Sequence, residues 1–487
     1  MFGKKQYSIL DRIAPKKLFY LIGISTIVCL FMGILTRHYE LFLIPPGILF
    51  LVLLFVDFRK VYYLLIAMIP LSIEMDMPGG LSMDMPAEPL IIILMGTFFL
   101  YFFKNPAVLH KEFYRHPIIQ ILLLHLVWIL VAALFAEMKV IAIKFFLAKI
   151  WYITTFVFLT MAIIPNIKSF KMIYWLLILP ACYGILYTLL KHAALGFDFD
   201  TINQALRPFF RNHVNYAALL SLLFPFLLLA RTWYPKDSLA RQVVNGSILL
   251  FLEGIFFAYT RGGWLALVGA GISVILIKRK LVKTTITVAL ICIALVVGVL
   301  ISNNTYLDYA PDFETTVYHG NLKDHLSATT EMKDVSGAER IYRWVAAVRM
   351  STEHPITGFG PNNFYHHYKS YTVSDFATYV SDNPEKSGTH NYFLMLLTEQ
   401  GFVGMSIFIW LTFMIFHIAI KRYHLLVDEN EKNFLMAIIA SMVIIYVQLM
   451  LSDLVEALKI GVFFFINLAL IVSIDAKHRI NKARNEN

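Results

Sequence analysis

Charged side chains are scarce in this chain. Lys, Arg, Asp and Glu together make up 15% of its 487 residues, whereas soluble globular proteins average about 25%. Hydrophobic residues make up 59%, and they fall in long uninterrupted runs. A soluble enzyme, a disordered chain and a collagen-like fibre are therefore excluded. The composition predicts an all-α membrane protein that crosses the bilayer many times.

Cysteine is also rare. The three cysteines, Cys29, Cys182 and Cys292, all lie in apolar runs, and their spacing matches neither a metal site nor a bridge across an exterior loop. We expect packing roles for them and no bound metal. The net charge of +10 could suggest nucleic acid, but in a membrane protein a basic excess mostly marks cytoplasmic loops beside anionic lipid. Membrane lipids, and no nucleic acid, are therefore expected as partners.

Apolar runs long enough to cross a membrane recur along the chain. A helix needs about 20 apolar residues to span the hydrocarbon core, with a range of about 17–25. Because the run 61–73 is short, we expect about 12–14 transmembrane helices. The fourteen runs are 18–35, 41–56, 61–73, 88–103, 117–135, 145–164, 172–190, 214–230, 243–260, 262–277, 285–301, 402–420, 433–451 and 457–474.

Lys and Arg gather in alternate loops, and this distribution predicts the orientation. Basic residues precede the first run, but no small-residue cleavage site follows it, so we expect a retained first span. The Lys and Arg content of the short loops places both termini in the cytoplasm. The chain then divides into residues 1–301 with about 11 spans, an exterior loop over 302–390, and residues 391–487 with about 3 spans and a cytoplasmic tail.

The loop 302–390 is the largest segment outside the predicted spans. Its first part, Asn303–Asp334, is polar and irregular. In its second part, Ala338–Met350, apolar side chains recur at helical spacing and predict an amphipathic helix that lies against the membrane or the spans. Those side chains are Ile341, Trp344, Val345 and Val348.

Two arginine-bearing motifs lie on the exterior side. Arg261 belongs to the turn Thr-Arg-Gly-Gly between two apolar runs, where glycines allow a bulky head group to approach and a guanidinium can bind phosphate through two hydrogen bonds. A snorkelling interfacial arginine is the structural alternative. Arg340 and Arg343 lie three residues apart, on neighbouring positions of one helix face. A solvated helix face would explain them as well.

A turn rich in glycine and proline follows the amphipathic helix. It contains Gly358 and Gly360 between Pro355 and Pro361, and Asn362 follows directly. Residues of these types favour a tight, defined turn over a helix. The turn could shape the wall of a binding site, or it could simply end the helix.

The last motif begins with His390-Asn391 and opens an apolar stretch that is longer than the membrane core is thick. We expect its first turns to stand above the hydrocarbon, with a break at Gly401. On the first turn of a helix the positive end of the helix dipole would keep His390 neutral. A neutral imidazole near basic residues is suited to act as a general base. A structural histidine is the alternative.

The order and spacing of these motifs resemble the O-antigen ligase and polymerase superfamily of bacterial envelope enzymes. The similarity extends from about Arg207 to Gly404 and rests on Thr-Arg-Gly-Gly, Gly-x-Gly-x-Asn-x-Phe, and His-Asn-x-x-Leu followed by Glu-x-Gly-x-x-Gly. The stretch from Arg207 through Arg211 to Asn215 is a weaker element. The first spans resemble the family only in hydropathy, and the number of runs exceeds what is usual in it.

This resemblance implies a GT-C-like glycosyltransferase in the bacterial inner membrane, with residues 302–390 in the periplasm. Family members take a glycan from undecaprenyl pyrophosphate and need no nucleotide, metal or other cofactor. By the same resemblance, Arg261 and Arg340 would grip the pyrophosphate and His390 would be the catalytic histidine. Substrate-binding roles are further expected for Arg207, Arg211, Arg343, Asn391, Gly358, Gly360 and Asn362.

The nature of the acceptor divides the superfamily. A ligase uses the lipid A-core as acceptor, whereas an O-antigen or exopolysaccharide repeat-unit polymerase uses a second lipid-linked glycan. The pyrophosphate of that second glycan would require a second basic cluster. On the exterior side outside the long loop, only Arg207 and Arg211 form a pair, so the ligase is preferred and the polymerase is the alternative.

Two other classes of protein remain. A lipid-linked glycan flippase or other transporter would place charges along a pathway through the membrane, but Lys149, Glu253 and Lys459 are few and scattered. A structural membrane protein would not need arginines and a histidine gathered on one face.

Overall fold

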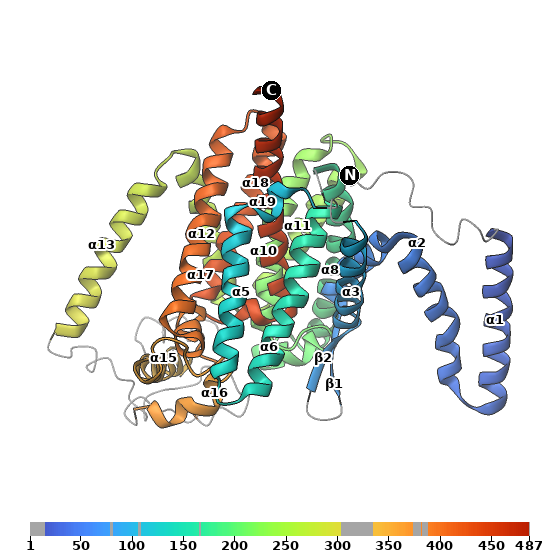
Figure 1. The fold of residues 1–487 in the computed structure, drawn as a ribbon, viewed down its shortest axis with the longest axis horizontal. Helices are drawn as coiled ribbons and strands as arrows, with labels where there is room; N and C mark the ends of the chain where they lie inside the picture. Colours follow the sequence, from blue (N-terminus) through green and yellow to red (C-terminus); the bar gives the residue numbers. More distant parts are fainter. Residues whose placement is uncertain are drawn as a thin grey trace.

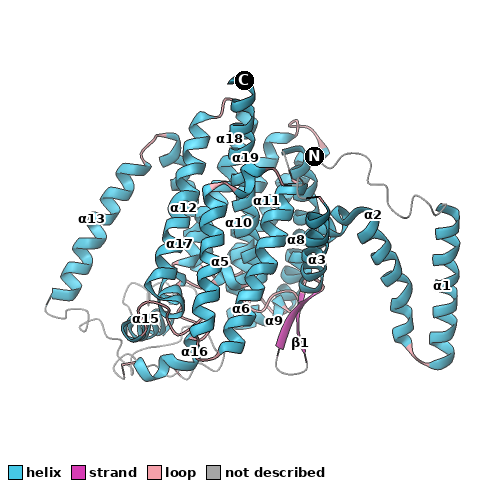
Figure 2. Ribbon diagram, viewed as in Figure 1, coloured by secondary structure: helices cyan, strands magenta, loops and turns pink. Residues whose placement is uncertain are grey.

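The computed structural model describes residues 15–77, 81–105, 109–164, 167–302, 335–373, 381 and 388–486. These residues form helices almost throughout, together with a two-stranded sheet (Figure 1, Figure 2). Ten of the described helices are long and apolar enough to cross a membrane, and a bent pair would make eleven. The predicted all-α polytopic membrane protein is confirmed.

The chain begins with α1 (Pro15–Thr36) and α2 (Ile44–Met68). α1 and the first half of α2 lie apart from the rest (Figure 1), whereas the second half of α2 packs into the core, where Val61, Tyr62 and Leu65 are fully buried. α2 is broken at Asp57, whose φ of −155° and ψ of 85° are not helical, and its two halves are bent by 120°. The predicted runs 41–56 and 61–73 correspond to these two halves.

Most of the remaining helices form one bundle. In chain order they are α3 (Ala87–Lys104), α4 (Lys111–Tyr114), α5 (Pro117–Phe135), α6 (Lys139–Tyr152), α7 (Thr160–Ile163), α8 (Ile167–Ala194), α9 (Ile202–Leu206), α10 (His213–Ala230), α11 (Leu239–Phe256), α12 (Arg261–Lys278), α17 (Tyr392–Leu425), α18 (Glu429–Leu449) and α19 (Leu458–Glu486). A π-helical stretch, Ile153–Leu159, joins α6 to α7. α18 packs against α10 and α12, and the apolar part of α19 is almost entirely buried.

α13 (Val282–Ile301) leans away from this bundle (Figure 1). Beyond Val282 its described side chains are exposed along the whole helix, so lipid would surround it in a membrane. With α13 included, each of the fourteen predicted apolar runs overlaps a helix.

One end of the bundle carries a hairpin and two helices that lie outside the predicted spans (Figure 1). Strands β1 (Ile73–Met77) and β2 (Leu81–Met85) pair antiparallel; the sequence patterns did not predict them. α15 (Val335–Glu353), which packs against α17, is the predicted amphipathic helix. α16 (Phe364–His367) follows it. The predicted irregular stretch Asn303–Asp334 lies outside the described residues.

The buried face of α15 differs from the one predicted. Tyr342, Ala346, Ala347 and Met350 are buried and pack against aromatic side chains around α16. The predicted face is only half-buried at its first three positions, and Val348 is 52% exposed. The difference arises because alanines and a tyrosine fit the close approach of α15 to α17 and to the turn Tyr368–Tyr371. The bulkier predicted side chains lie at the edge of this contact.

Candidate active site

His390 and Arg343 are in direct contact at the end of the bundle that carries α15. Arg343 lies on α15 and is 4% exposed. Its Nη1 donates to Nε2 of His390 over 2.8 Å and to the carbonyl oxygen of Gly388 over 3.2 Å. A guanidinium can only donate, so Nε2 must be the acceptor. The imidazole of His390 is therefore neutral and carries its hydrogen on Nδ1.

Arg343 is itself held by other groups. Its Nη2 donates to Oε2 of the buried Glu339, one helical turn earlier, over 3.2 Å, and Glu339 also accepts a hydrogen bond from Ser381. Next to it, Trp344 Nε1 donates to the carbonyl oxygen of Thr389 over 3.0 Å. These contacts fix α15 against the segment 388–390.

The neutral state of His390 has a different cause from the one predicted. α17 begins only at Tyr392, with Asn391 as its N-cap, so His390 precedes the helix and does not lie on its first turn. Instead, burial, followed by the positive charges of Arg343 and Arg340, lowers the pKa of His390 to about 3. The expectation of a neutral imidazole stands, but the helix dipole does not explain it.

Asn391 uses its side chain to begin α17. Its Oδ1 accepts hydrogen bonds from the backbone N–H groups of Phe393 and Leu394 over 3.0 and 3.1 Å, and its Nδ2 donates to the carbonyl oxygen of Met450 over 3.4 Å. Two of the orphan donors at the helix start are thereby satisfied. The structure thus gives Asn391 a positioning role beside His390.

The turn after α18 lies between the arginine motif and the histidine motif. A Cβ on Gly262 would lie 3.4 Å from Cδ1 of Leu451, and a Cβ on Gly388 would contact the carboxylate of Asp453. Arg261, the first residue of α12, is half-buried next to Gly262. The structure therefore brings both predicted motifs to the same turn.

Asp453 is a residue that the motifs did not identify. Burial raises the pKa of its carboxyl group, while the positive charge of Arg343 opposes that rise. A carboxyl group this close to Gly388 and Arg343 belongs to the same electrostatic cluster as His390. The available signal was the short break between two apolar runs, which contains two acidic residues, Asp453 and Glu456.

Arg207 and Arg211 are exposed and lie between α9 and α10. Arg211 forms an ion pair of 3.8 Å with Glu74 of the hairpin, and the carbonyl oxygen of Arg207 accepts a hydrogen bond from Lys191. Their segment reaches the arginine motif at its end, where Thr260 donates to the carbonyl oxygen of His213 over 3.4 Å. The described ion pair of Arg211 is thus made with the hairpin and not with the cluster around His390.

The glycine-rich turn docks on a break in α17. The break occurs at Gly401, as predicted, where φ is 69° and ψ is −176°. The carbonyl oxygens of Thr398 and Glu399 accept hydrogen bonds from the N–H groups of Phe359 and Gly360 over 2.9 and 3.0 Å. Backbone groups released by the break are therefore satisfied by the turn.

The side chain of Glu399 completes this docking. It is 3% exposed, and its two oxygens accept from the N–H groups of Asn362, over 2.7 Å, and Phe364, over 3.2 Å. Gly358 and Gly360 have positive φ values. A Cβ on Gly358 would collide with the backbone of α17, and a Cβ on Gly360 would collide with Ala136, directly after α5. The turn is thus a fixed wall, from which the side chain of Asn362 is exposed.

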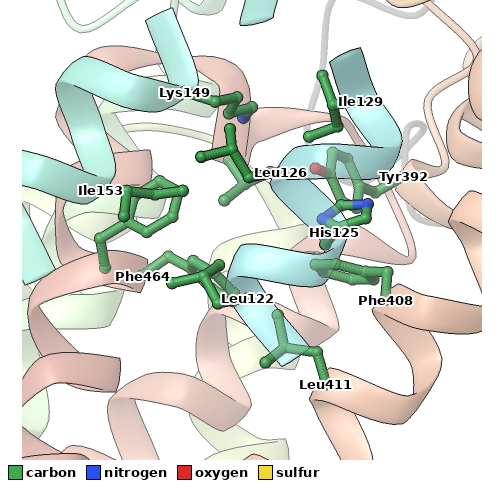
Figure 3. Close-up of a pocket in the computed structure, with 12 residues that line it drawn as sticks. Leu122, His125, Leu126, Ile129, Lys149, Ile153, Tyr392, Phe408, Leu411 and Phe464 are labelled. Atoms are coloured by element: carbon green, nitrogen blue, oxygen red, sulfur yellow. The ribbon is translucent and has the colours of Figure 1, made fainter. Parts of the chain in front are cut away.

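A second polar cluster lies deeper in the bundle, around a cavity of about 20 Å³ (Figure 3). Lys149 Nζ donates to both carboxylate oxygens of Glu456 over 2.7 and 2.6 Å. Tyr392 donates to the same carboxylate over 3.0 Å, and His125 also lines the cavity. The lysine predicted to lie within a span is therefore paired.

The other two charges of the predicted spans have different surroundings. Lys459 is buried and donates to backbone carbonyl oxygens of Pro70, Ser72 and Phe209. Glu253 is exposed on α11. Within the ranges that the structure describes, no group of three or more His, Cys, Asp or Glu residues could hold a metal ion.

No curated protein matches the chain significantly. The sequence model of the O-antigen ligase family matches residues 246–409, a stretch that contains Arg261, Arg340 and His390. The predicted resemblance is confirmed over this stretch: residues 246–409 are similar to the O-antigen ligase family, which supports a relationship to the O-antigen ligase and polymerase superfamily.

Proposed function

We propose that this protein is a membrane glycosyltransferase that moves a glycan from undecaprenyl pyrophosphate to an acceptor hydroxyl group. Its relationship to O-antigen ligases supports a glycosyl-transferring enzyme. The observation that carries the proposal is the contact between Arg343 and His390, a buried guanidinium against a neutral imidazole. The pair offers a base for the acceptor and a cation for the leaving group.

The arginines act on the leaving group in this proposal. Negative charge grows on the pyrophosphate as its bond to C1 of the sugar breaks. Fixed guanidinium groups stabilise this charge more in the transition state than in the ground state. Arg261 and Arg340 would hold the pyrophosphate. Arg343 would be a further donor, because its buried Nε–H has no hydrogen-bond partner among the described residues.

Binding of the donor would also uncover the base. Nε2 of His390 cannot accept a proton while it accepts the hydrogen bond from Arg343. Pyrophosphate oxygens are better acceptors for a guanidinium than a neutral imidazole is, because both partners are then charged. The donor would therefore attract Arg343, and its negative charge would raise the pKa of His390.

The transfer step then needs only side chains of this protein. His390 accepts the proton of the acceptor hydroxyl group while the hydroxyl oxygen attacks C1. The bond from C1 to the pyrophosphate breaks in the same displacement, so the configuration at C1 inverts. Cleavage of the activated glycosyl pyrophosphate supplies the driving force, and no nucleotide, metal or other cofactor takes part.

For the acceptor, we favour the lipid A-core and therefore an O-antigen ligase. A polymerase would bind two pyrophosphates, and the second would require its own basic cluster. Arg207 and Arg211 are the pair available outside the loop, and Arg211 already pairs with Glu74. One phosphate of a lipid A-core could still be bound there. A repeat-unit polymerase remains the second candidate, since both enzymes share the donor.

We further propose that the protein lies in the bacterial inner membrane with both termini cytoplasmic and residues 302–390 in the periplasm. The distribution of Lys and Arg supports this orientation. The helices α15 and α16 lie at the end of the bundle opposite the C-terminus (Figure 1), as the proposal requires.

The test is a deletion of the gene, with the surface glycan resolved by size. Loss of a ligase leaves bare lipid A-core while full-length chains accumulate on undecaprenyl pyrophosphate. Loss of a polymerase leaves core capped with one repeat, which would rule out the ligase. An unchanged glycan pattern together with unchanged lipid-linked intermediates would overturn the glycosyltransferase itself.

A further inference from the structure

The hairpin β1–β2 carries its methionines on one face. Met75 lies directly opposite Met83, and Met85 lies opposite Ile73. Because residues two apart on a strand share a face, Met75, Met83 and Met85 all project to the same side. Opposite residues in an antiparallel pair have Cβ atoms about 4.5–5.5 Å apart. Three thioethers on flexible side chains can therefore converge on one point.

The other face of the hairpin is acidic, and it lies near basic side chains of the bundle. Glu74 lies opposite Asp84. Glu74 pairs with Arg211 at 3.8 Å, and the positive charge of Lys459 opposes the rise that burial causes in the pKa of Asp84. Lys459 also donates to the carbonyl oxygen of Ser72, just before β1, over 2.8 Å. The acidic face is thus held against positive charges.

The methionine face is partly accessible. Met75 is 50% exposed, and Met83 and Met85 are half-buried. No described cysteine competes at this place, since Cys29, Cys182 and Cys292 lie in α1, α8 and α13.

Thioether sulfur is a soft ligand. It binds Cu(I) and related soft monovalent cations, whereas hard cations such as Mg²⁺ and Ca²⁺ require oxygen. We propose that Met75, Met83 and Met85 form a site for a soft monovalent cation, Cu(I) or Ag(I), coordinated by three thioethers. The carboxylates on the opposite face supply no ligand.

The test measures Ag(I) bound by the purified full-length protein after desalting, in a variant with its three cysteines replaced by alanine. In this background we compare Met75→Leu/Met83→Leu/Met85→Leu with the unchanged hairpin. Leucine preserves size and hydrophobicity but removes sulfur, so a face that serves only apolar contact would not respond. We expect the triple variant to lose one equivalent of silver per chain.

A matched control removes three exposed methionines that lie far apart in the sequence, at Met32, Met138 and Met172. It should keep the full amount of bound silver. Equal binding by the hairpin variant and the unchanged hairpin would overturn the proposal, as would an equal loss in the scattered control.

A second measurement needs no hairpin variant, and so it does not depend on that variant folding. Methionine oxidises to the sulfoxide when its sulfur is accessible. In the cysteine-free protein, Ag(I) should slow the oxidation of Met75 and Met83 by peroxide, but not that of Met172. Equal oxidation of these three residues with and without silver would also exclude the site.

Discussion

Arg343 donates a hydrogen bond of 2.8 Å to Nε2 of His390, the lone pair that a general base would use. Without substrate, the proposed base is therefore unprotonated, but Arg343 occupies the lone pair on its Nε2. The arrangement protects a neutral histidine from protonation by solvent, and it makes exposure of the base depend on an anion that attracts Arg343. Each of the first three predictions follows from this relationship or from the charges around it.

Replacing His390 with Gln should lower the turnover of purified protein on a lipid-linked donor by about 10²–10⁴-fold, the usual contribution of a general base. The amide oxygen of glutamine can still accept the hydrogen bond from Arg343, so the fold should persist. His366→Gln, at an exposed position on α16, is the matched control and should keep full turnover. Near-normal turnover of the His390 variant would make this histidine structural.

The pH dependence of kcat/KM should lack a step at the ordinary histidine pKa of about 6.5. The pKa of His390 is lowered to about 3, so its base form is present above that value and is lost only as the pH falls through it. Since kcat/KM reports the free enzyme, it should not fall between pH 8 and pH 6 because of His390.

The variant Asp453→Asn removes the neighbouring carboxyl group, so that its titration is not mistaken for that of His390. Burial raises the pKa of this carboxyl group. A step near pH 6.5 that persists in this variant and disappears in His390→Gln would contradict the expected pH profile.

Substitutions of Arg261 and Arg340 should lower glycan transfer, whereas substitution of Arg279 should not. Arg261→Lys keeps the charge but loses the two-pronged contact with phosphate, and Arg340→Ala loses the charge. Hydrogen bonds to charged groups contribute about 1.5–3 kcal/mol, so transfer should fall by about 10- to 100-fold in each. Arg279→Ala, after the opposite end of α12, should transfer normally. Equal tolerance of all three would mean that these arginines serve topology.

Gly401→Ala should destabilise the protein by about 1–3 kcal/mol, because a φ of 69° with a ψ of −176° is essentially restricted to glycine. The added methyl group would also collide with the carbonyl oxygen of Ile356. Gly271→Ala, in open space within α12, is the control and should be neutral or slightly stabilising. The midpoints of thermal unfolding in detergent give the comparison, and equal midpoints would contradict the strain.

Orientation can be measured with single cysteines in the cysteine-free background. A cysteine at Ser370, exposed after α16, should react with a membrane-impermeant thiol reagent added from outside. A cysteine at Lys280, exposed between α12 and α13, should react only after permeabilisation. The reverse pattern would place the proposed site in the cytoplasm, where it could not meet a periplasmic acceptor.

The spans and the main site motifs could be predicted because their signals are local. A membrane helix needs only a long apolar run, and the break at Gly401 follows from a stretch that is longer than the membrane is thick. His390 and Arg343 could be singled out for the same reason, since each belongs to a compact motif.

Tertiary contacts could not be predicted in this way. The hydrogen bond from Arg343 to His390 joins residues 47 positions apart, and nothing in either motif specifies the other as its partner. Asp453 was missed because its importance comes from the close approach of Gly388. The face of α15 was misplaced because alanines, which carry little hydropathy, proved to be the contact residues.

The ion pair between Lys149 and Glu456 bears on how the chain is assembled. Its partners are 307 residues apart, so α6 enters the membrane long before Glu456 has been synthesised. Until then the ammonium group of Lys149 has to be solvated by water or lipid head groups, since a charge left alone in the apolar interior is costly. The charge of Lys149 is thus neutralised only when the segment between α18 and α19 is in place. In a chain that ends before this segment, Lys149 would have no counter-ion and the packing of α6 would be weakened.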